Sequence, residues 1–251
     1  MIRRIFRFEL LFLGFLLFAC RSINRSSADL DMPPSVVLFS FDDGPNAHGD
    51  TTSRLLDVLK KYQIHALFFL LGENAEHNPD LVRRIYNEGH CIANHGYSDK
   101  WAGRMNDDDF LDNLIKGEAA ISAALGHDLY PRLYRPHGGF YSAGQEKIFR
   151  EAGYTLIPAN IRVYDAVVSG KDRQKIAGKI IKKIEKQGGG IILLHDMRGS
   201  HFNMEKELDK NPQGVFNRSW IPEVVEEIII LLLEKGFVFG SPAAALTKNS
   251  Q

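Results

Sequence analysis

The stretch VVLFSFDDGPN, residues 36–46, runs from six mostly apolar residues into two adjacent carboxylates, Asp42 and Asp43, and then into a Gly-Pro turn. The apolar run predicts a strand that belongs in the core. Asp, Gly and Pro are common where strands end, so the turn alone requires no chemistry. Whether the two carboxylates do more depends on the polar residues that follow other apolar runs.

Over the rest of the chain, apolar runs that predict strands alternate with amphipathic stretches that predict helices. The predicted strands are residues 36–42, 65–71, 91–95, 132–136, 154–160, 190–195 and 236–240. The predicted helices are residues 51–63, 79–89, 107–125, 142–152, 172–187 and 221–235. This alternation predicts an α/β fold with a parallel sheet, and seven repeats predict that the sheet closes into a barrel resembling a TIM barrel.

The composition allows one such domain and argues against a nucleic-acid partner. The chain has 251 residues, of which 44% are hydrophobic and 25% are charged, and this is long enough for a single barrel. Lys plus Arg equals Asp plus Glu at 31 each, so there is no basic excess to bind a phosphate backbone. The two cysteines cannot form a disulfide framework if one of them carries lipid.

The first 20 residues predict export. Three arginines precede the apolar run LLFLGFLLFAC, which is shorter than the roughly 20 residues of a membrane-spanning helix, and this pattern is typical of a secretion signal. The sequence LFAC resembles a bacterial lipoprotein cleavage box, which would place a lipid on Cys20 and hold the protein at a membrane of the cell envelope. Phe18 is bulkier than usual there, so a signal anchor or a simple cleaved signal are the alternatives. The polar residues 21–35 predict a tether, and residues 36–245 the single folded domain.

Polar side chains follow the predicted strands where these end. In a barrel, the loops that leave the carboxyl ends of the strands share one face, so these side chains are expected to gather there. A lone histidine after an apolar run is usually structural, but several polar clusters on one rim predict a functional site. The residues concerned are Asp42, Asp43, Asn94, His95, Arg135, His137, Asp165, His195 and Asp196.

Four motifs carry a family resemblance over residues 36–245. FSFDDGP, ANHGYSD, YRPHGG and IILLHD resemble the ordered motifs of the polysaccharide deacetylases, the NodB-homology group of carbohydrate esterase family 4. The resemblance implies a distorted (β/α)7 barrel and a metal-dependent hydrolase that removes acetyl groups from glycans containing N-acetylglucosamine, such as peptidoglycan or chitin. It implies a divalent metal, first of all Zn²⁺, with Mn²⁺, Co²⁺ or Mg²⁺ as alternatives.

The resemblance also assigns roles to the two acids. It implies that Asp43 and His95 bind the metal, and that Asp42 is the base that takes a proton from water. Arg135 would pair with Asp42 and keep it ionised, as a nearby opposite charge does. Adjacent carboxylates of an extended chain diverge, so one can bind a metal while the other faces the water.

The remaining assignments concern the leaving group and the acetyl pocket. The resemblance implies that His195 protonates the leaving nitrogen, that Asp165 holds the imidazolium in position, and that Leu193 walls the pocket for the acetyl methyl. Oxyanion stabilisation would come from the metal and a backbone N–H.

The sequence departs from the family pattern at the third metal ligand. The usual second histidine, four residues after the first, is replaced by Asp99. A carboxylate can bind zinc and suits harder cations still better, so Asp43, His95 and Asp99 are predicted to form the metal site. The alternatives are that His137 or His90 supplies the third ligand, or that no metal binds.

A second departure follows the fifth strand, where RVYDA keeps Asp165 but has Arg162 and Ala166 at the other two family positions. The aromatic wall of the acetyl pocket is then missing or comes from Trp101 or Trp220. Trp101 and His137 are the predicted substrate-binding residues beside Leu193, although Trp101 could equally be an ordinary loop aromatic.

Two kinds of function fit this pattern. The first is the metal-dependent deacetylase, with an esterase that removes O-acetyl groups from xylan-like chains as its close variant. The second is a degenerate relative that binds glycan without hydrolysing it. The retention of a base together with a general acid favours catalysis, because a pure binding protein needs neither.

Overall fold

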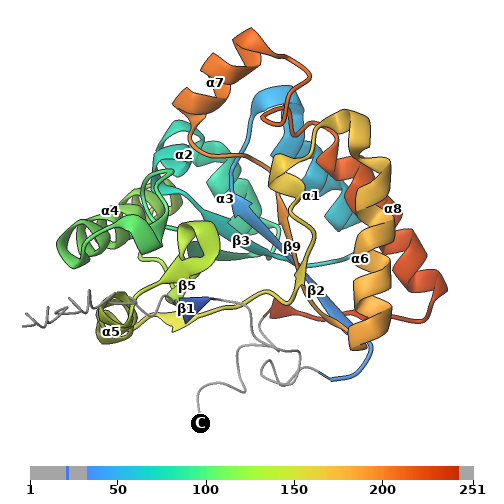
Figure 1. Cartoon of the computed structure of the whole chain (residues 1–251), viewed down its shortest axis with the longest axis horizontal. Coiled ribbons are helices and arrows are strands. Elements are labelled where there is room, and N and C mark those ends of the chain that lie inside the picture. The colour runs from blue at the N-terminus through green and yellow to red at the C-terminus, as the bar shows by residue number, and fades with distance from the viewer. Residues whose placement is uncertain (1–20, 23–32, 243–251) are drawn as a thin grey trace, which may run out of the picture.

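Eight parallel strands form one curled sheet in the computed structural model, which describes residues 21–22 and 33–242 (Figure 1). The order across the sheet is β7 (Thr155–Leu156), β5 (Leu133–Tyr134), β4 (Cys91–Asn94), β3 (Leu67–Leu70), β2 (Val36–Asp43), β9 (Gly190–His195) and β8 (Ile161–Arg162). The last strand, β10 (Val238–Phe239), pairs with the start of β2. The parallel α/β fold class is therefore confirmed.

The curled sheet is an incomplete barrel. Among the described residues, the ladder ends at β7 on one side and at β8 on the other, where strand pairing stops. The predicted strand 154–160 is too long, because only β7 lies within it, and the next strand, β8, begins at Ile161, beyond the predicted bounds. Pro158 lies between them, and proline cannot donate a hydrogen bond to a ladder.

Strand β2 runs through the middle of the sheet and alternates between two apolar environments. Val37, Phe39 and Phe41 pack into the larger core between the sheet and its helices, whereas Leu38 packs into a second core on the concave face of the sheet. Because successive side chains of a strand point to opposite faces, Ser40 and Asp42 follow Leu38 onto the concave face. The carboxylate of Asp42 thus ends up inside the curl.

Helices cover the outside of this sheet, and the predicted ones are present. They are α1 (Thr51–Lys61), α3 (Pro79–Asn87), α4 (Asp107–Leu125), α5 (Ala143–Glu151), α6 (Gln174–Gln187) and α8 (Ile221–Glu234). The first turn of α4 is capped by the Asn106 side chain, which accepts from the N–H of Asp109, and Gly126 ends the helix in a left-handed conformation. These local signals explain why the bounds of α4 match the predicted ones.

Two helices escaped sequence analysis. The short α2 (Gly72–His77) follows β3, and α7 (His201–Lys210) lies in the long connection from β9 to α8, at the top of Figure 1. Two short strands, β1 (Arg21–Ser22) and β6 (Phe140–Tyr141), pair antiparallel, so part of the predicted tether contacts the domain. The predicted signal segment with Cys20, residues 23–32 and the end of the predicted domain at 243–245 lie outside the described residues.

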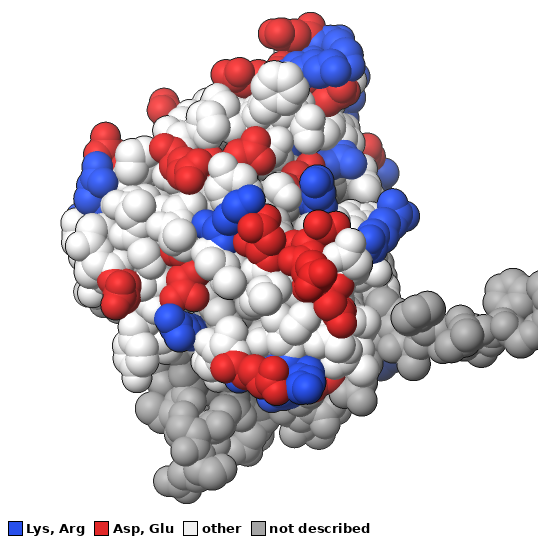
Figure 2. Space-filling model, turned by 90° about the vertical axis from the view of Figure 1, so that its left-hand side faces the viewer, with Lys and Arg blue, Asp and Glu red and all other residues white. Residues whose placement is uncertain are grey.

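No helix within the described ranges is long and apolar enough to cross a membrane. Acidic and basic side chains are interspersed over the face seen in Figure 2, as the balanced composition predicts.

Candidate active site

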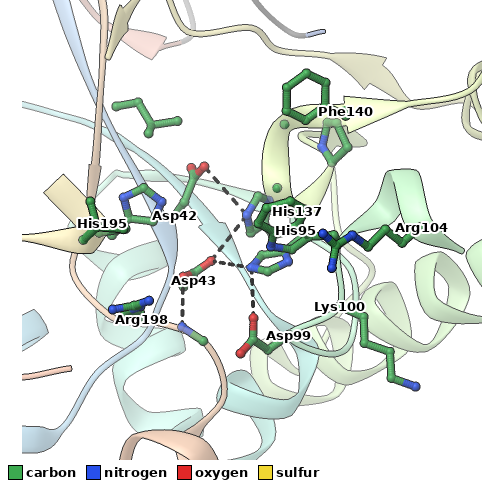
Figure 3. Close-up of a pocket in the computed structure, with 18 of the residues that line it drawn as sticks. Asp42, Asp43, His95, Asp99, Lys100, Arg104, His137, Phe140, His195 and Arg198 are labelled. Atoms are coloured by element: carbon green, nitrogen blue, oxygen red, sulfur yellow. Dashed lines mark hydrogen bonds and ion pairs between the residues drawn. The ribbon is translucent and has the colours of Figure 1, made fainter. Parts of the chain in front are cut away.

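A cavity of about 890 Å³ opens where the central strands end. This volume lies in the usual range for sites that bind small molecules. Asp42 and Asp43 line it, and Figure 3 shows His95 and His137 on one side of the two aspartates and His195 on the other. Its wider lining includes Asp99, Lys100, Trp101, Arg104, Phe140, Arg162, Tyr164, Leu193, Arg198 and Phe216.

Asp42 is held by Arg135. The Nη1 of Arg135 donates to Oδ1 of Asp42 at 2.6 Å and to the Ser40 hydroxyl at 2.9 Å, and both partners of the ion pair are buried. The guanidinium also stacks over the ring of Phe69 at 3.9 Å. The second oxygen of Asp42, Oδ2, lies 3.7 Å from Nε2 of His95. Arg135 therefore fixes one oxygen of Asp42 and leaves the other facing the cavity.

Asp43 reaches the same cavity because its backbone leaves the extended conformation. Its φ of 74° lies in the left-handed region, which breaks the strand alternation that would turn its side chain away from Asp42. The N–H of Gly199 donates to Oδ2 at 3.0 Å, and the Asn74 amide donates to the Asp43 carbonyl at 2.8 Å. The other oxygen, Oδ1, is buried with no hydrogen-bond partner among the described residues.

The charge of Asp43 is set by its surroundings. Burial raises the pKa of its carboxyl, but the contact with His95 and the nearby imidazoles of His137 and His195 more than offset this, so the pKa lies well below its usual range. An ionised, buried oxygen without a partner is the kind of group that a cation stabilises.

His95 presents its Nε2 to Asp43. Its Nδ1 lies 2.7 Å from the backbone carbonyl of Arg135, which can only accept, so Nδ1 carries the proton. The other nitrogen, Nε2, lies 3.5 Å from Oδ1 of Asp43. This arrangement is the usual one for a metal-binding histidine, whose second nitrogen is anchored to a carbonyl or carboxylate.

His137 completes the group. Its Nε2 lies 3.5 Å from Oδ1 of Asp43, and its ring centroid lies 5.2 Å from that of His95. One donor atom from each of Asp43, His95 and His137 lies within 4.8 Å of the others, and all three residues are buried. One carboxylate and two imidazoles are a ligand set that suits catalytic zinc, so these side chains fit the metal that the sequence predicts.

Asp99, the predicted third ligand, lies next to this group. Its Oδ1 is 3.2 Å from Nε2 of His137, and its Oδ2 is 3.5 Å from the Asn203 amide. Gly199 packs against it with a φ of 65°, and a Cβ at that position would lie 2.3 Å from Oδ2 of Asp99. The carboxylate therefore faces His137, and its role as a ligand stays a prediction.

His90, the other alternative for the third ligand, is excluded by its position. It lies just before β4, at the opposite end of that strand from His95, where its Nδ1 accepts from the N–H of Ala66 at 3.1 Å. Burial, with a smaller contribution from His65, lowers the pKa of His90 to about 4. His90 is a neutral core histidine.

On the other side of the cavity, His195 pairs with Asp165. Its Nδ1 lies 3.0 Å from Oδ1 of Asp165, and its backbone N–H donates to Oδ2 of the same carboxylate at 2.9 Å. Burial lowers the pKa of His195, but the carboxylates of Asp165 and of the more distant Asp43 and Asp42 raise it by a larger amount. The resulting pKa is about 9. The imidazole is thus held protonated at neutral pH, with Asp165 beneath it.

Arg218 is a buried residue that sequence analysis missed. It is fully buried and donates to the carboxylate of Asp165 and to the carbonyl of His195. Nothing in the sequence separates this arginine from the others in the chain, because it lies in the loop before α8 and outside the motifs.

The three predicted substrate-binding residues lie at the cavity, but the alternative aromatic, Trp220, does not. Leu193, His137 and Trp101 all line the cavity, and Trp101 is 51% exposed with the Arg104 guanidinium 4.4 Å from its ring centre. Trp220, the alternative aromatic, is wrong as a wall of the cavity, because it is buried in the main core and its ring contacts Arg218. Tyr164, 67% exposed at the cavity edge, is an aromatic that sequence analysis did not consider.

Comparison with known proteins shows which family the sequence is similar to. A family model described as polysaccharide deacetylase matches residues 29–157. A chitooligosaccharide deacetylase of Rhizobium leguminosarum bv. trifolii is 49% identical over 163 residues, which cover 64% of this chain and 71% of that protein. A peptidoglycan-N-acetylglucosamine deacetylase of Bacillus cereus is 34% identical over 165 residues, which cover 66% of this chain and 57% of the relative.

The fold is similar to that of a solved relative. The crystal structure of a peptidoglycan N-acetylglucosamine deacetylase in complex with 4-naphthalen-1-yl-N-oxidanyl-benzamide aligns with a TM-score of 0.67 and 30% sequence identity. The alignment covers 85% of this chain and 89% of the other.

Proposed function

This chain belongs to the polysaccharide deacetylase family, and from that premise we propose that it hydrolyses the acetamide group of N-acetylglucosamine units in a glycan of the cell envelope. The observation that carries the proposal is the placement of an aspartate pair, Asp42 and Asp43, and a protonated histidine on opposite sides of one cavity. A base and an acid so arranged serve the two proton transfers of amide hydrolysis.

A metal fits on one side of this cavity. The residues that would hold it are Asp43, His95 and His137, and it would supply Lewis-acid polarisation of the acetyl carbonyl and a lower pKa for water. Zinc suits a set of one carboxylate and two imidazoles better than magnesium or calcium does.

Asp42 acts as the base in this proposal. Its Oδ2 faces the cavity, while Oδ1 is tied to Arg135 at 2.6 Å. With one oxygen held by Arg135, the second oxygen of Asp42 is positioned to take a proton from water. The neighbouring Asp43 contacts Gly199, His95 and His137 and serves as a metal ligand in this proposal. The strand therefore ends in two acids because one is the base and the other is a ligand.

His195 acts as the acid. Its Nδ1 proton is directed at Asp165, which leaves Nε2 for the leaving nitrogen of the sugar. Leu193, from the same strand, also lines the cavity and supplies apolar surface for the acetyl methyl. Trp101 and Tyr164, both exposed at the edge of the cavity, offer ring faces on which sugar rings can pack.

The test is acetate release from oligomers of N-acetylglucosamine by the purified protein, before and after removal of metal by a chelator. We expect turnover that is lost on chelation and restored by zinc. O-acetylated xylan, assayed in parallel, measures the esterase alternative. Full activity in a preparation that elemental analysis finds free of metal would rule out the metal site. No acetate release from any of these substrates, with zinc bound, would favour a glycan-binding relative without activity.

We propose that the protein acts at the cell envelope, held there by a lipid on Cys20. The support is the apolar leader and the LFAC box of the sequence. Cys20→Ser is expected to move the protein out of the membrane fraction. An unmodified N-terminus beyond residue 20, found by mass spectrometry in membrane-bound wild-type protein, would contradict the anchor.

A further inference from the structure

Arg218 is a charged side chain with no exposed surface, placed in the loop between α7 and α8. A buried guanidinium is costly unless its donors and its charge are satisfied. Arg218 and Arg135 are the two largest fully buried side chains in the described part of the chain, and Arg135 belongs to the base side of the site. Arg218 has the corresponding place on the acid side.

The guanidinium of Arg218 joins two segments that are far apart in the chain. Its Nη2 donates to Oδ2 of Asp165 in a short ion pair and to the carbonyl of His195 at 3.0 Å. Its Nε donates to the same His195 carbonyl at 3.1 Å, and its Nη1 donates to the Asp165 carbonyl at 2.9 Å. The indole of Trp220 packs on the guanidinium at 4.5 Å. The side chain and backbone of Asp165 are thereby fixed relative to the end of β9.

These contacts determine which oxygen of Asp165 meets the imidazole. Oδ2 receives Arg218 and the backbone N–H of His195, so Oδ1 is the oxygen left for Nδ1 of His195. A planar fork with several donors can hold both a carboxylate and a carbonyl, which a lysine ammonium on a flexible stem cannot do equally well.

We propose that Arg218 is a positioning residue for the general acid: it holds Asp165 so that the imidazole of His195 keeps its orientation and its proton at the leaving nitrogen. The role in turnover rests on the proposed deacetylase function. Arg218 itself does not line the cavity, so it acts through Asp165 and His195.

The first test is a double-mutant cycle with Arg218→Lys, His195→Ala and the double variant, assayed on an N-acetylglucosamine oligomer. Arg218→Lys keeps the positive charge and removes the fork. We expect it to lower kcat by about tenfold or more with KM within about twofold, in the range found when an orienting partner is lost. In the His195→Ala background the same change is expected to have almost no effect, because residues that act as a unit are not additive. Equal losses in both backgrounds would reduce Arg218 to a structural residue.

The leaving group offers a second readout. Hydrolysis of 4-nitrophenyl acetate needs no protonation of its leaving group, so Arg218→Lys is expected to slow amide hydrolysis far more than this ester hydrolysis. Parallel losses on both substrates would contradict the proposal. Arg84→Lys is the matched control, since Arg84 on α3 also donates to two carboxylates and a carbonyl but lies outside the cavity.

An NMR titration of the His195 ring in the metal-free protein needs no turnover and decides the point even if the chain had no deacetylase activity. We expect Arg218→Lys to move the titration midpoint of His195 down toward its ordinary value, because the contact with Asp165 loosens while the charge at 218 is retained. An unchanged midpoint in a folded variant would overturn the proposal. Should Arg218→Lys not fold, Asp165→Asn and wild type still test it, since a midpoint unchanged by Asp165→Asn would remove the contact through which Arg218 acts.

Discussion

Oδ1 of Asp99 lies 3.2 Å from Nε2 of His137, so the residue at the family's second-histidine position contacts a histidine that comes from another loop. The sequence has no histidine four residues after His95. His137, from the connection after β5, provides an imidazole at this place instead, and Asp99 is the carboxylate that contacts it. The protein retains two imidazoles near Asp43 by a different route through the chain.

The first prediction separates these two residues. His137→Ala is expected to weaken zinc binding more than Asp99→Ala does, since the first removes a proposed ligand and the second an outer partner, whose loss typically costs about 10–100-fold. Competition with a chromophoric chelator measures both affinities. His77→Ala, which changes a histidine outside the cavity, is the control. A loss of zinc affinity in Asp99→Ala that equals or exceeds the loss in His137→Ala would show that Asp99 is a ligand.

The second prediction concerns the base. Asp42→Asn keeps the shape of the side chain but removes the proton acceptor, so acetate release is expected to fall by about 10²–10⁴-fold. Zinc content should stay at the wild-type level, because Asp42 is outside the proposed ligand set. A loss smaller than about tenfold with zinc still bound would place the base elsewhere.

The third prediction is a loss of stability as the pH rises past neutrality. The pKa of His195 is raised from 6.5 to about 9 in the folded protein, because Asp165 and the site aspartates outweigh the effect of burial. A raised pKa contributes stability that is complete below the unfolded value and is lost as the pH rises through the folded value. The free energy of unfolding of the metal-free protein is therefore expected to decline between pH 6.5 and about 9.

His195→Gln is expected to remove this decline, and His127→Gln, an exposed histidine, is expected to keep it. Urea unfolding at a series of pH values measures all three proteins. The same slope in His195→Gln as in wild type would show that His195 is not the titrating group.

The fourth prediction concerns Asp196, the buried neighbour of His195. Burial raises the pKa of its carboxyl to about 7, although the Thr52 hydroxyl donates to it. Its Oδ1 has no hydrogen-bond partner among the described residues, and the carboxyl packs against Gly44, where a Cβ would lie 2.6 Å from it. Its neutral form is therefore favoured in the fold.

A carboxyl with a raised pKa contributes stability that is lost as the pH rises from 3.8 to about 7. Asp196→Asn stays neutral, so its unfolding free energy relative to wild type is expected to increase over that range. Urea unfolding at both ends of the range gives the difference. A difference that does not change with pH would mean that Asp196 is ionised in the folded protein.

The sequence by itself determined the central strand, six of the helices and several residues of the candidate site. Strand β2 and helix α4 are encoded locally, the first by an apolar run ending in two acids and the second by an apolar stripe between an asparagine cap and a glycine. The carboxyl ends of parallel strands share one edge, so the sequence also predicts that Asp42, Asp43, His95 and His195 lie near one another, as they do around the cavity.

Only the tertiary structure decided how that cavity is completed. The left-handed backbone of Asp43 turns it to the same side as Asp42, the loop after β5 brings His137 to Asp43, and the loop before α8 brings Arg218 beneath Asp165. These contacts depend on the paths of loops and on buried charge, which leave no periodic pattern in the sequence. The physical reason is that local sequence determines individual helices and strands, which are short. The contacts of a loop side chain depend instead on how the whole sheet curls and brings distant segments together.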